Sequence, residues 1–157
     1  MKITYRIFTD SDTTVITEYI HKLYHEDPGE RPIWPENIHK TIESLTKHPD
    51  RGSIIVFDNA GAVIGYAILI NYWSNEFGGN IINIDELYIK DEYRSQGIGT
   101  RFIEYLKNIV SLEHRSPYNW KVLPEMIKRT TCTKSSGLNG IKTPRMTWNC
   151  SQAGYLV

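Results

Sequence analysis

The sequence predicts an α+β fold, in which a mixed, largely antiparallel β-sheet is flanked by helices within one domain over residues 1–157. Runs of β-forming residues and runs of apolar residues at helical spacing follow in the order strand, two helices, three strands, helix. Two of the strands are joined by a short turn signal, which favours antiparallel pairing. A chain of 157 residues is long enough to bury a core, and no repeat or linker marks a domain boundary.

The N-terminal part is expected to contain one strand and two helices. Residues 2–9, KITYRIFT, alternate in the manner of a strand. Residues 10–27 carry apolar side chains at helical spacing, and the acidic residues from Asp10 to Asp12 offer N-caps. Three prolines in 28–35 end this helix, and residues 36–48 predict a second amphipathic helix.

The next part predicts three strands and one helix. Residues 52–73 contain two β-rich runs joined by DNAG at 58–61, which is a hairpin signal. Residues 74–80 are expected to form a loop, and residues 81–89, IINIDELYI, are expected to form a central strand. A glycine-bearing turn at 90–99 precedes a helix at 100–110, whose apolar residues lie on one face.

Composition and charge exclude several classes of partner. The chain has 18 Lys and Arg and 18 Asp and Glu, so no nucleic-acid or membrane partner is expected from its charge. No apolar run has membrane-spanning length and no signal peptide is recognisable, which predicts a cytoplasmic protein. Cys132 and Cys150 lack metal-type spacing, and His21 and His25 have no evident third ligand, so no metal is expected.

The turn KDEYRSQGIG carries the clearest chemical signal. Gly97 and Gly99 allow positive φ angles and leave the backbone accessible to a ligand. Unpaired amides at the start of the following helix, together with the helix dipole, favour an anion such as phosphate. Arg94 could add a bidentate contact. A lone G-x-G is a weak signal, and the alternative interpretation is simply a tight strand-to-helix turn.

This segment resembles the pyrophosphate-binding signature Q/R-x-x-G-x-G/A of the GNAT superfamily of N-acetyltransferases, matched here by Arg94, Ser95, Gln96, Gly97, Ile98 and Gly99. The order of elements resembles that fold over about residues 3–110, and the resemblance resumes at 138–149. It implies that acetyl-CoA is the cosubstrate. It also implies that the pantetheine pairs with the backbone of Leu87, Tyr88 and Ile89, and that the pyrophosphate lies on the amides from Gln96 to Thr100.

In such a family an acetyl group passes directly to an amine, whose proton a carboxylate can accept. Asp85 and Glu86 on the central strand are the candidates, and alternation along a strand points them to opposite faces. We favour Glu86 as the catalytic base. The alternative is that either carboxylate is solvated or structural.

Acidic and aromatic residues gather in the segments that usually line the acceptor site of this family. Carboxylates beside aromatic rings suit a cationic amine. The substrate-binding candidates are Glu26, Asp27, Trp34 and Trp73, accompanied by Glu30, Glu36, Glu76, Tyr72 and Phe77. A loose similarity to diamine acetyltransferases favours a polyamine-like acceptor, with an aminoglycoside or a peptide amine as alternatives. These residues could also be ordinary solvated loop charges.

Residues 112–137 depart from the family. A family pattern N-x-x-A-x-x-L-Y-x-K-x-G-F, which carries a tyrosine that acts as general acid, is expected at 125–138 and is absent. In a shifted reading frame, Asn119 into Trp120 must encode Leu and Trp120 into Lys121 must encode Glu. The shifted frame can continue as N-D-K-A-x-x-L-Y-x-K-x-G. We therefore hypothesise that 112–137 is an out-of-frame reading with two compensating shifts. The alternative is a divergent loop with a short helix.

Two other classes of function remain open. If 112–137 is the true sequence, no residue in it has a catalytic role, and the chain is a weakened enzyme or a CoA-binding domain without turnover. A protein-interaction domain without a cofactor is the third possibility. Thermal stabilisation by acetyl-CoA separates the first two from the third. The resemblance also implies a possible homodimer.

Overall fold

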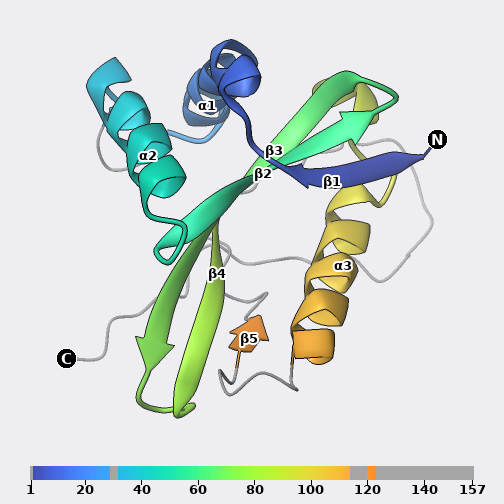
Figure 1. The fold of residues 1–157 in the computed structure, drawn as a ribbon. Coiled ribbons are helices and arrows are strands. Elements are labelled where there is room, and N and C mark those ends of the chain that lie inside the picture. Colours follow the sequence, from blue (N-terminus) through green and yellow to red (C-terminus); the bar gives the residue numbers. More distant parts are fainter. Residues whose placement is uncertain (1, 29–31, 114–119, 123–157) are drawn as a thin grey trace.

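A computed structural model of the protein describes residues 2–28, 32–113 and 120–122, with side chains described up to residue 110. Five strands form one sheet in the order β1-β2-β3-β4-β5, with helices on both faces (Figure 1). The strands β1 (Ile3–Ile7), β2 (Gly52–Asn59), β3 (Ala62–Ser74) and β4 (Gly79–Ile89) pair antiparallel with their neighbours. The predicted α+β class and the largely antiparallel sheet are confirmed.

The fifth strand makes the sheet mixed. β5 (Trp120–Val122) runs parallel to β4 and pairs with it only at Asn80–Ile82. It falls inside the segment 112–137, in which no strand was predicted from the sequence as it stands. Three predictions lie outside the described residues, because the structure does not describe 114–119 or 123–157. They are the proposed frame shift, the tyrosine pattern expected at 125–138 and the resemblance at 138–149.

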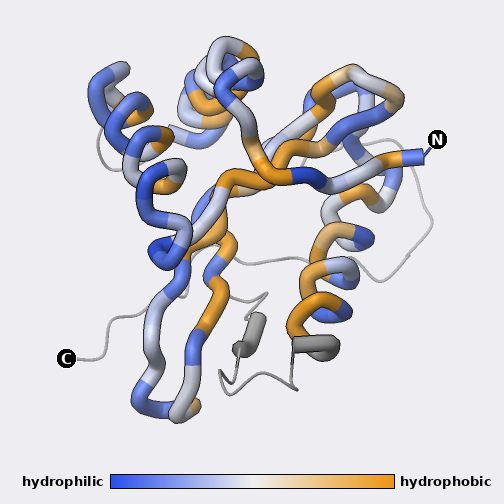
Figure 2. Tube along the Cα trace, in the orientation of Figure 1, coloured by the Kyte–Doolittle hydropathy of each residue, from blue (hydrophilic) through white to orange (hydrophobic). Residues whose placement is uncertain are grey.

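The sheet separates two apolar cores. Helices α1 (Thr13–Glu26) and α2 (Pro35–Lys47) pack on one face, where Ile16, Ile38 and Tyr66 are buried. Helix α3 (Ile98–Glu113) packs on the other face, where Phe57 and Phe102 are buried. Figure 2 shows α2 and α3 apolar toward the sheet and hydrophilic away from it, as amphipathic helices require.

Several boundaries differ from the predicted ones. β3 and β4 extend into both ends of the expected loop at 74–80, because the two strands pair until Ser74 meets Gly79. Helix α2 begins at Pro35, since proline suits the first helical position. Asp10–Asp12 form a 3₁₀ turn, η1, before α1, and the side chain of Asp12 makes no hydrogen bond that caps α1.

The predicted hairpin at 58–61 is confirmed. Ala60 and Gly61 both have positive φ angles, 54° and 90°, and the Gly61 amide donates to Oδ1 of Asp58 at 2.8 Å. Positive φ at both central positions is the geometry of the turns that join two-residue hairpins. The turn therefore fixes the first two pairs of β2 with β3, Asn59 with Ala62 and Asp58 with Val63, beyond which a bulge shifts the register.

A β-bulge interrupts β4 next to the predicted catalytic pair. Ile68 of β3 lies opposite Glu86 and Leu69 lies opposite Ile84, so Asp85 is the extra residue. Because the bulge breaks the two-residue alternation, Ile84 joins the core under α3, whereas Glu86 meets Tyr66 of the core under α1 and α2. The bulge thus directs Glu86 to the face that α1 covers.

Candidate active site

Glu86 is a buried carboxylate held by a buried tyrosine. Its side chain is only 5% exposed, and the Tyr66 hydroxyl donates to Oε2 at 2.8 Å. Burial and then the Glu86 carboxylate raise the pKa of Tyr66 well above its usual value, so this hydroxyl stays protonated and acts as the donor. Tyr24 of α1 also raises the pKa of Tyr66, which places α1 beside this pair. A carboxylate fixed in this way is suited to accept a proton from a bound amine.

Two neighbours of Glu86 on β4 have different environments. Asp85, at the bulge, is half-buried, whereas Asn83 is 4% exposed. Oδ1 of Asn83 is buried and accepts no hydrogen bond from the described residues. Asn83 lies opposite Ile70, which packs against the core under α1 and α2, so Asn83 is on the same face as Glu86. An unpaired buried oxygen is rare in proteins and marks this part of the face as polar.

The turn between β4 and α3 has the backbone of an anion site. Ser95 and Gly97 have φ angles of 60° and 70°, and helix α3 begins at Ile98. Within the described part of the chain, no acceptor is recorded for the amides from Gly97 to Thr100, and the first recorded bond runs from Arg101 N to Gly97 O at 3.0 Å. Free amides at a helix start, with the positive end of the helix dipole, favour a phosphate group.

The two glycines of the motif differ in how strongly the backbone at each position requires glycine. Gly97 has a left-handed φ of 70°, which a residue with a side chain rarely adopts. Gly99 has no such constraint, and a Cβ there would lie 3.6 Å from Cδ2 of Leu87, an ordinary contact. Position 99 therefore has room for alanine as well as glycine.

Family and structural comparisons agree with this geometry. Residues 17–115 match the model of the acetyltransferase (GNAT) family, which is more than half of the chain. The chain belongs to the GNAT acetyltransferase family. The predicted family and fold are thereby confirmed. A search of curated proteins gives no match.

Solved structures resemble this GNAT chain over most of its length. A possible acetyltransferase from Clostridium difficile 630 is 23% identical with a TM-score of 0.64, over 78% of this chain and 77% of the other. A predicted acetyltransferase with acetyl-CoA from Clostridium acetobutylicum is 16% identical with a TM-score of 0.57, over 78% and 80%. An aminoglycoside acetyltransferase from an uncultured soil metagenomic sample is 19% identical with a TM-score of 0.51, over 78% and 80%. At these identities the likeness shows the fold.

Arg94 of the GNAT signature is engaged with protein groups. Its guanidinium pairs with both carboxylate oxygens of Glu26, at 2.8 and 3.1 Å, and with Asp91 at 2.9 Å. Nε donates to the carbonyl oxygen of Ile89 at 2.6 Å. The structure thus brings together a residue predicted to bind the cofactor and one predicted to bind the acceptor.

The segment predicted to bind pantetheine lies beyond the described pairing of β4 with β5. Leu87, Tyr88 and Ile89 end β4, whereas the described pairing between β4 and β5 stops at Ile82. Within the described residues, β5 therefore does not accompany β4 along 87–89. The side chains of Leu87 and Tyr88 are buried, so only the backbone of this segment could pair with a ligand.

The predicted acceptor residues do not gather at one point. Trp34 precedes α2 and Trp73 lies near the end of β3, and both are more than half exposed. The start of α2 and the β3–β4 hairpin lie toward opposite ends of the molecule (Figure 1). Asp27 follows α1 and is half-buried, and Glu30 lies outside the described residues. Glu36, Glu76, Tyr72 and Phe77 are exposed.

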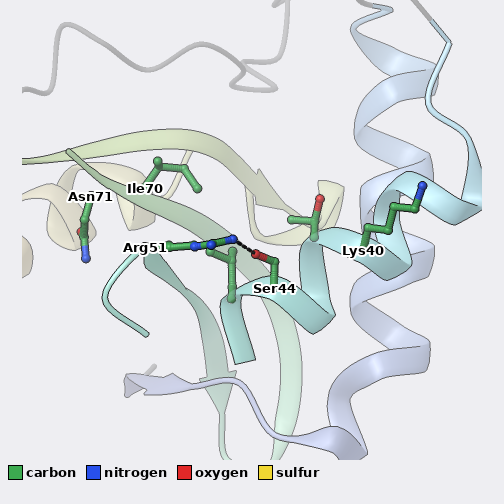
Figure 3. A pocket seen from close by; sticks show the side chains of 7 residues that line it. Lys40, Ser44, Arg51, Ile70 and Asn71 are labelled. Atoms are coloured by element: carbon green, nitrogen blue, oxygen red, sulfur yellow. Dashed lines mark hydrogen bonds between the residues drawn. The ribbon is translucent and has the colours of Figure 1, made fainter. Parts of the chain in front are cut away.

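A separate groove lies between α2 and the sheet. Its volume is about 470 Å³, and its lining comprises Lys40, Thr41, Ser44, Leu45, Arg51, Ile70 and Asn71. Figure 3 shows the Arg51 side chain directed to Ser44, to whose hydroxyl it donates at 3.3 Å. The Lys40 side chain points away from this pair. Neither Glu86 nor the glycine turn lines this groove, so it is not the centre of the predicted chemistry.

Three residues at the site were not predicted from the sequence. Tyr66 lies in an apolar strand, a pattern typical of core packing, and only the pairing of β3 with β4 reveals its contact with Glu86. Asn83 interrupts the apolar run IINI, which was a usable signal. Arg101, in the first turn of α3, donates from Nη1 to the Gln96 carbonyl oxygen at 2.8 Å, and its position two residues after Gly99 was also visible.

Metal and membrane features complete the description. His21 and His25 are exposed on α1, and no group of three potential metal ligands occurs among residues 2–28, 32–113 and 120–122. None of the helices described has the length and apolar content needed to cross a membrane.

Proposed function

We propose that this protein is an N-acetyltransferase that moves an acetyl group from acetyl-CoA to a primary amine of a small, cationic acceptor. The observation that carries the proposal is the continuous segment from the buried Glu86 on β4 to the unpaired amides at the start of α3. It joins a proton acceptor to an anion site within one strand–turn–helix unit. Acetyl-CoA supplies the acetyl group as a thioester.

The protein's own groups have separate tasks in this reaction. The backbone of Leu87 to Ile89 holds the pantetheine, and the amides of the turn hold the pyrophosphate. Glu86 takes the proton from the acceptor ammonium, so that the neutral amine can attack the thioester carbon. Tyr66 fixes the carboxylate in place through its hydrogen bond to Oε2. Attack on the thioester carbon breaks the C–S bond, and the departing thiolate takes up the second proton that the acetylated nitrogen loses, so that the products are the amide and the free thiol of CoA.

A cationic acceptor is supported by the residues around the connection between α1 and α2. Asp27, Trp34 and Glu36 combine carboxylates with an exposed indole ring, which attract an ammonium group by charge and by cation–π contact. A polyamine is the first candidate. An aminoglycoside is the alternative, because one solved structure with this fold is named as an aminoglycoside acetyltransferase.

The test uses the whole protein with acetyl-CoA and a panel of polyamines, aminoglycosides and peptide amines. Thiol release and the mass of the acetylated product are measured. Glu86→Gln is expected to lower kcat by about 10²–10⁴-fold, the usual contribution of a positioned base. Asp85→Asn, a neighbouring carboxylate change, is the matched control and should retain most activity. A large loss in Asp85→Asn with an active Glu86→Gln variant would reverse the assignment.

A second candidate function is a CoA-binding domain without turnover. It is favoured by the absence of the family's tyrosine pattern from residues 125–138 of the printed sequence. Tight binding of CoA without thiol release on any amine would support it. The intact mass of protein expressed from its native gene decides whether residues 112–137 are read in frame, and a mass that fits the printed chain would reject the frame-shift hypothesis.

A further inference from the structure

The two arginines that flank the glycine turn differ in their surroundings. Arg94 precedes the turn and its side chain is only 10% exposed, whereas Arg101 follows the turn on α3 and is exposed. The family signature draws attention to the first of them. Their contacts indicate different roles.

Arg94 has little capacity left for a ligand. Nε donates to Ile89, Nη1 faces Glu26, and Nη2 faces both Glu26 and Asp91, so four of its five N–H groups have partners. One face of the guanidinium lies 5.3 Å from the centre of the Tyr88 ring. Two carboxylates already neutralise its single positive charge. Arg94 therefore adds no net positive potential to the turn.

The contacts of Arg94 hold three parts of the chain together. It joins the end of β4, through Ile89, to the last residue of α1, Glu26, and to the 3₁₀ turn η2 (Asp91–Tyr93). The next residue, Ser95, has a left-handed φ of 60°. A residue with a side chain adopts that conformation only when its surroundings impose it. The bonds of Arg94 fix the residue that immediately precedes Ser95.

Arg101 has the opposite properties. Its Nη1 donates to the carbonyl oxygen of Gln96 at 2.8 Å, and a Cβ added to Gly97 would lie 3.5 Å from the same atom. The guanidinium therefore lies directly beside the turn, because side chains on a helix lean toward its N-terminus. No ion pair of Arg101 is recorded within the described part of the chain, so its charge is not neutralised there.

We propose that Arg94 is a positioning residue that holds the turn against α1 through Glu26, and that Arg101 supplies the cationic contact to the pyrophosphate of CoA. The inference rests on the proposed function. It assigns Glu26 to the cofactor turn and removes it from the acceptor site. It also couples the end of α1 to cofactor binding.

The test measures CoA and dephospho-CoA affinity by calorimetry at low and high salt, below the melting temperature of every variant. Arg101→Gln is expected to weaken both ligands about tenfold, to reduce the salt dependence of binding and to leave the melting temperature unchanged. Lys40→Gln removes an exposed positive charge on α2 and is the matched control, which should change neither the affinity for CoA nor its salt dependence. A loss that disappears with dephospho-CoA, or no loss, would overturn the role of Arg101.

Glu26→Gln distinguishes the two possible roles of Arg94. If Arg94 positions the turn, this variant binds CoA more weakly and melts at a lower temperature, and Arg94→Gln adds little further loss. If Arg94 binds the pyrophosphate directly, releasing it from Glu26 tightens CoA binding, and that result would overturn the proposal. Glu18→Gln, which removes an exposed pair with Lys22 on the same helix, is the control.

Failure of the proposed function gives a different result. If the unaltered protein binds neither CoA nor dephospho-CoA, the acetyltransferase proposal and the Arg101 contact both fail. The melting temperatures of Arg94→Gln, Glu26→Gln and the double variant, measured without ligand, still decide the positioning role. Additive losses there would overturn it.

Discussion

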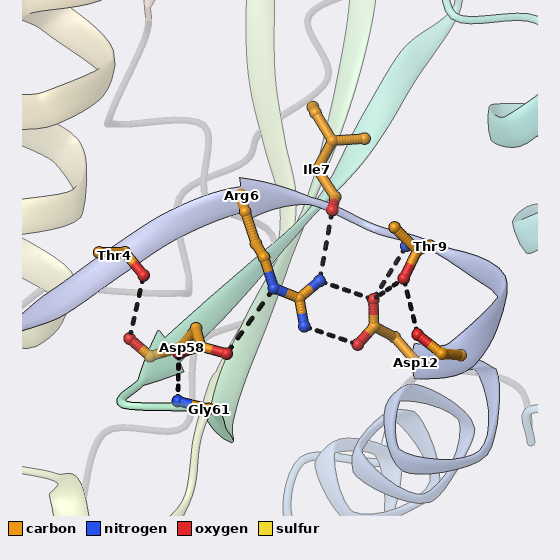
Figure 4. Close-up of polar contacts among 8 residues, drawn as sticks. Thr4, Arg6, Ile7, Thr9, Asp12, Asp58 and Gly61 are labelled. Atoms are coloured by element: carbon orange, nitrogen blue, oxygen red, sulfur yellow. Dashed lines mark hydrogen bonds and ion pairs between the residues drawn. The ribbon is translucent and has the colours of Figure 1, made fainter.

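The ion pair between Arg6 and Asp12 gives a prediction of stability that can be worked in numbers. Arg6 of β1 donates to both oxygens of Asp12 at 2.7 and 2.8 Å, and the Thr9 amide donates to the same carboxylate at 2.9 Å (Figure 4). The Arg6 hydrogen bonds lower the pKa of Asp12 from 3.8 to about 2, against the opposing effect of burial. At about 1.36 kcal/mol for each pKa unit, this difference corresponds to about 2.4 kcal/mol.

The expected effect of Asp12→Asn is smaller than this limit. The side chain of Asp12 is 5% exposed but that of Arg6 is 37% exposed, so solvent screens the pair and about 1–2 kcal/mol remains. Because the folded-state pKa is lowered, the contribution is fully present above pH 3.8 and is lost as the pH falls through about 2.

Urea unfolding of both proteins across this pH range measures the difference. Glu43→Gln removes an exposed, solvent-screened pair with Lys47 and should change the free energy of unfolding much less than Asp12→Asn does. An Asp12→Asn protein as stable as the unaltered one at neutral pH would refute the reasoning. A difference that persists undiminished below pH 2 would also refute it, because the contribution must vanish once Asp12 is protonated in both states.

Three further predictions concern the site itself. Tyr66→Phe removes the hydroxyl that donates to Glu86, so kcat/KM measured by thiol release should fall about tenfold or more. Unchanged kinetics would contradict the role of Tyr66 in positioning the carboxylate. Gly97→Ala forces a residue with a side chain into a left-handed φ, so it should cost about 1–2 kcal/mol in stability and weaken CoA binding. Gly99→Ala is the matched change without that strain, and calorimetry should show a change in CoA affinity of less than about twofold. Asn83→Leu removes a buried oxygen that has no hydrogen-bond partner among the described residues, and it should be neutral or stabilise by about 1 kcal/mol in urea unfolding. Marked destabilisation would contradict this expectation.

The fold was largely predictable because its signals are local. The DNAG turn, the apolar spacing of α1 and α3 and the strand IINIDELYI each encode their element within a few residues. The same holds for the glycine turn, whose left-handed Gly97 follows from the conformational freedom of glycine. The prediction that missed β5 relied on periodicity, which a strand of three residues cannot display.

The contacts of the site were not predictable because they join distant positions. Glu26 and Arg94 are 68 residues apart, and each was predicted to serve a different ligand. Alternation along the strand predicted that Asp85 and Glu86 point to opposite faces, but it does not locate the bulge at Asp85 that places Ile84 and Glu86 on opposite faces. Register between strands is a property of the folded sheet, so the contact of Tyr66 with Glu86 required the structure.

The two arginine ion pairs lie at the two ends of α1. Arg6 holds its start through Asp12, and Arg94 holds its last residue, Glu26. Between them, α1 covers the face on which Glu86 lies. The first pair involves only β1 and the η1 turn, so its loss should reduce stability at neutral pH without changing the salt dependence of CoA binding. The second pair shares its arginine with the cofactor turn. Arg94→Gln, unlike Asp12→Asn, should therefore lower both the melting temperature and the affinity for CoA.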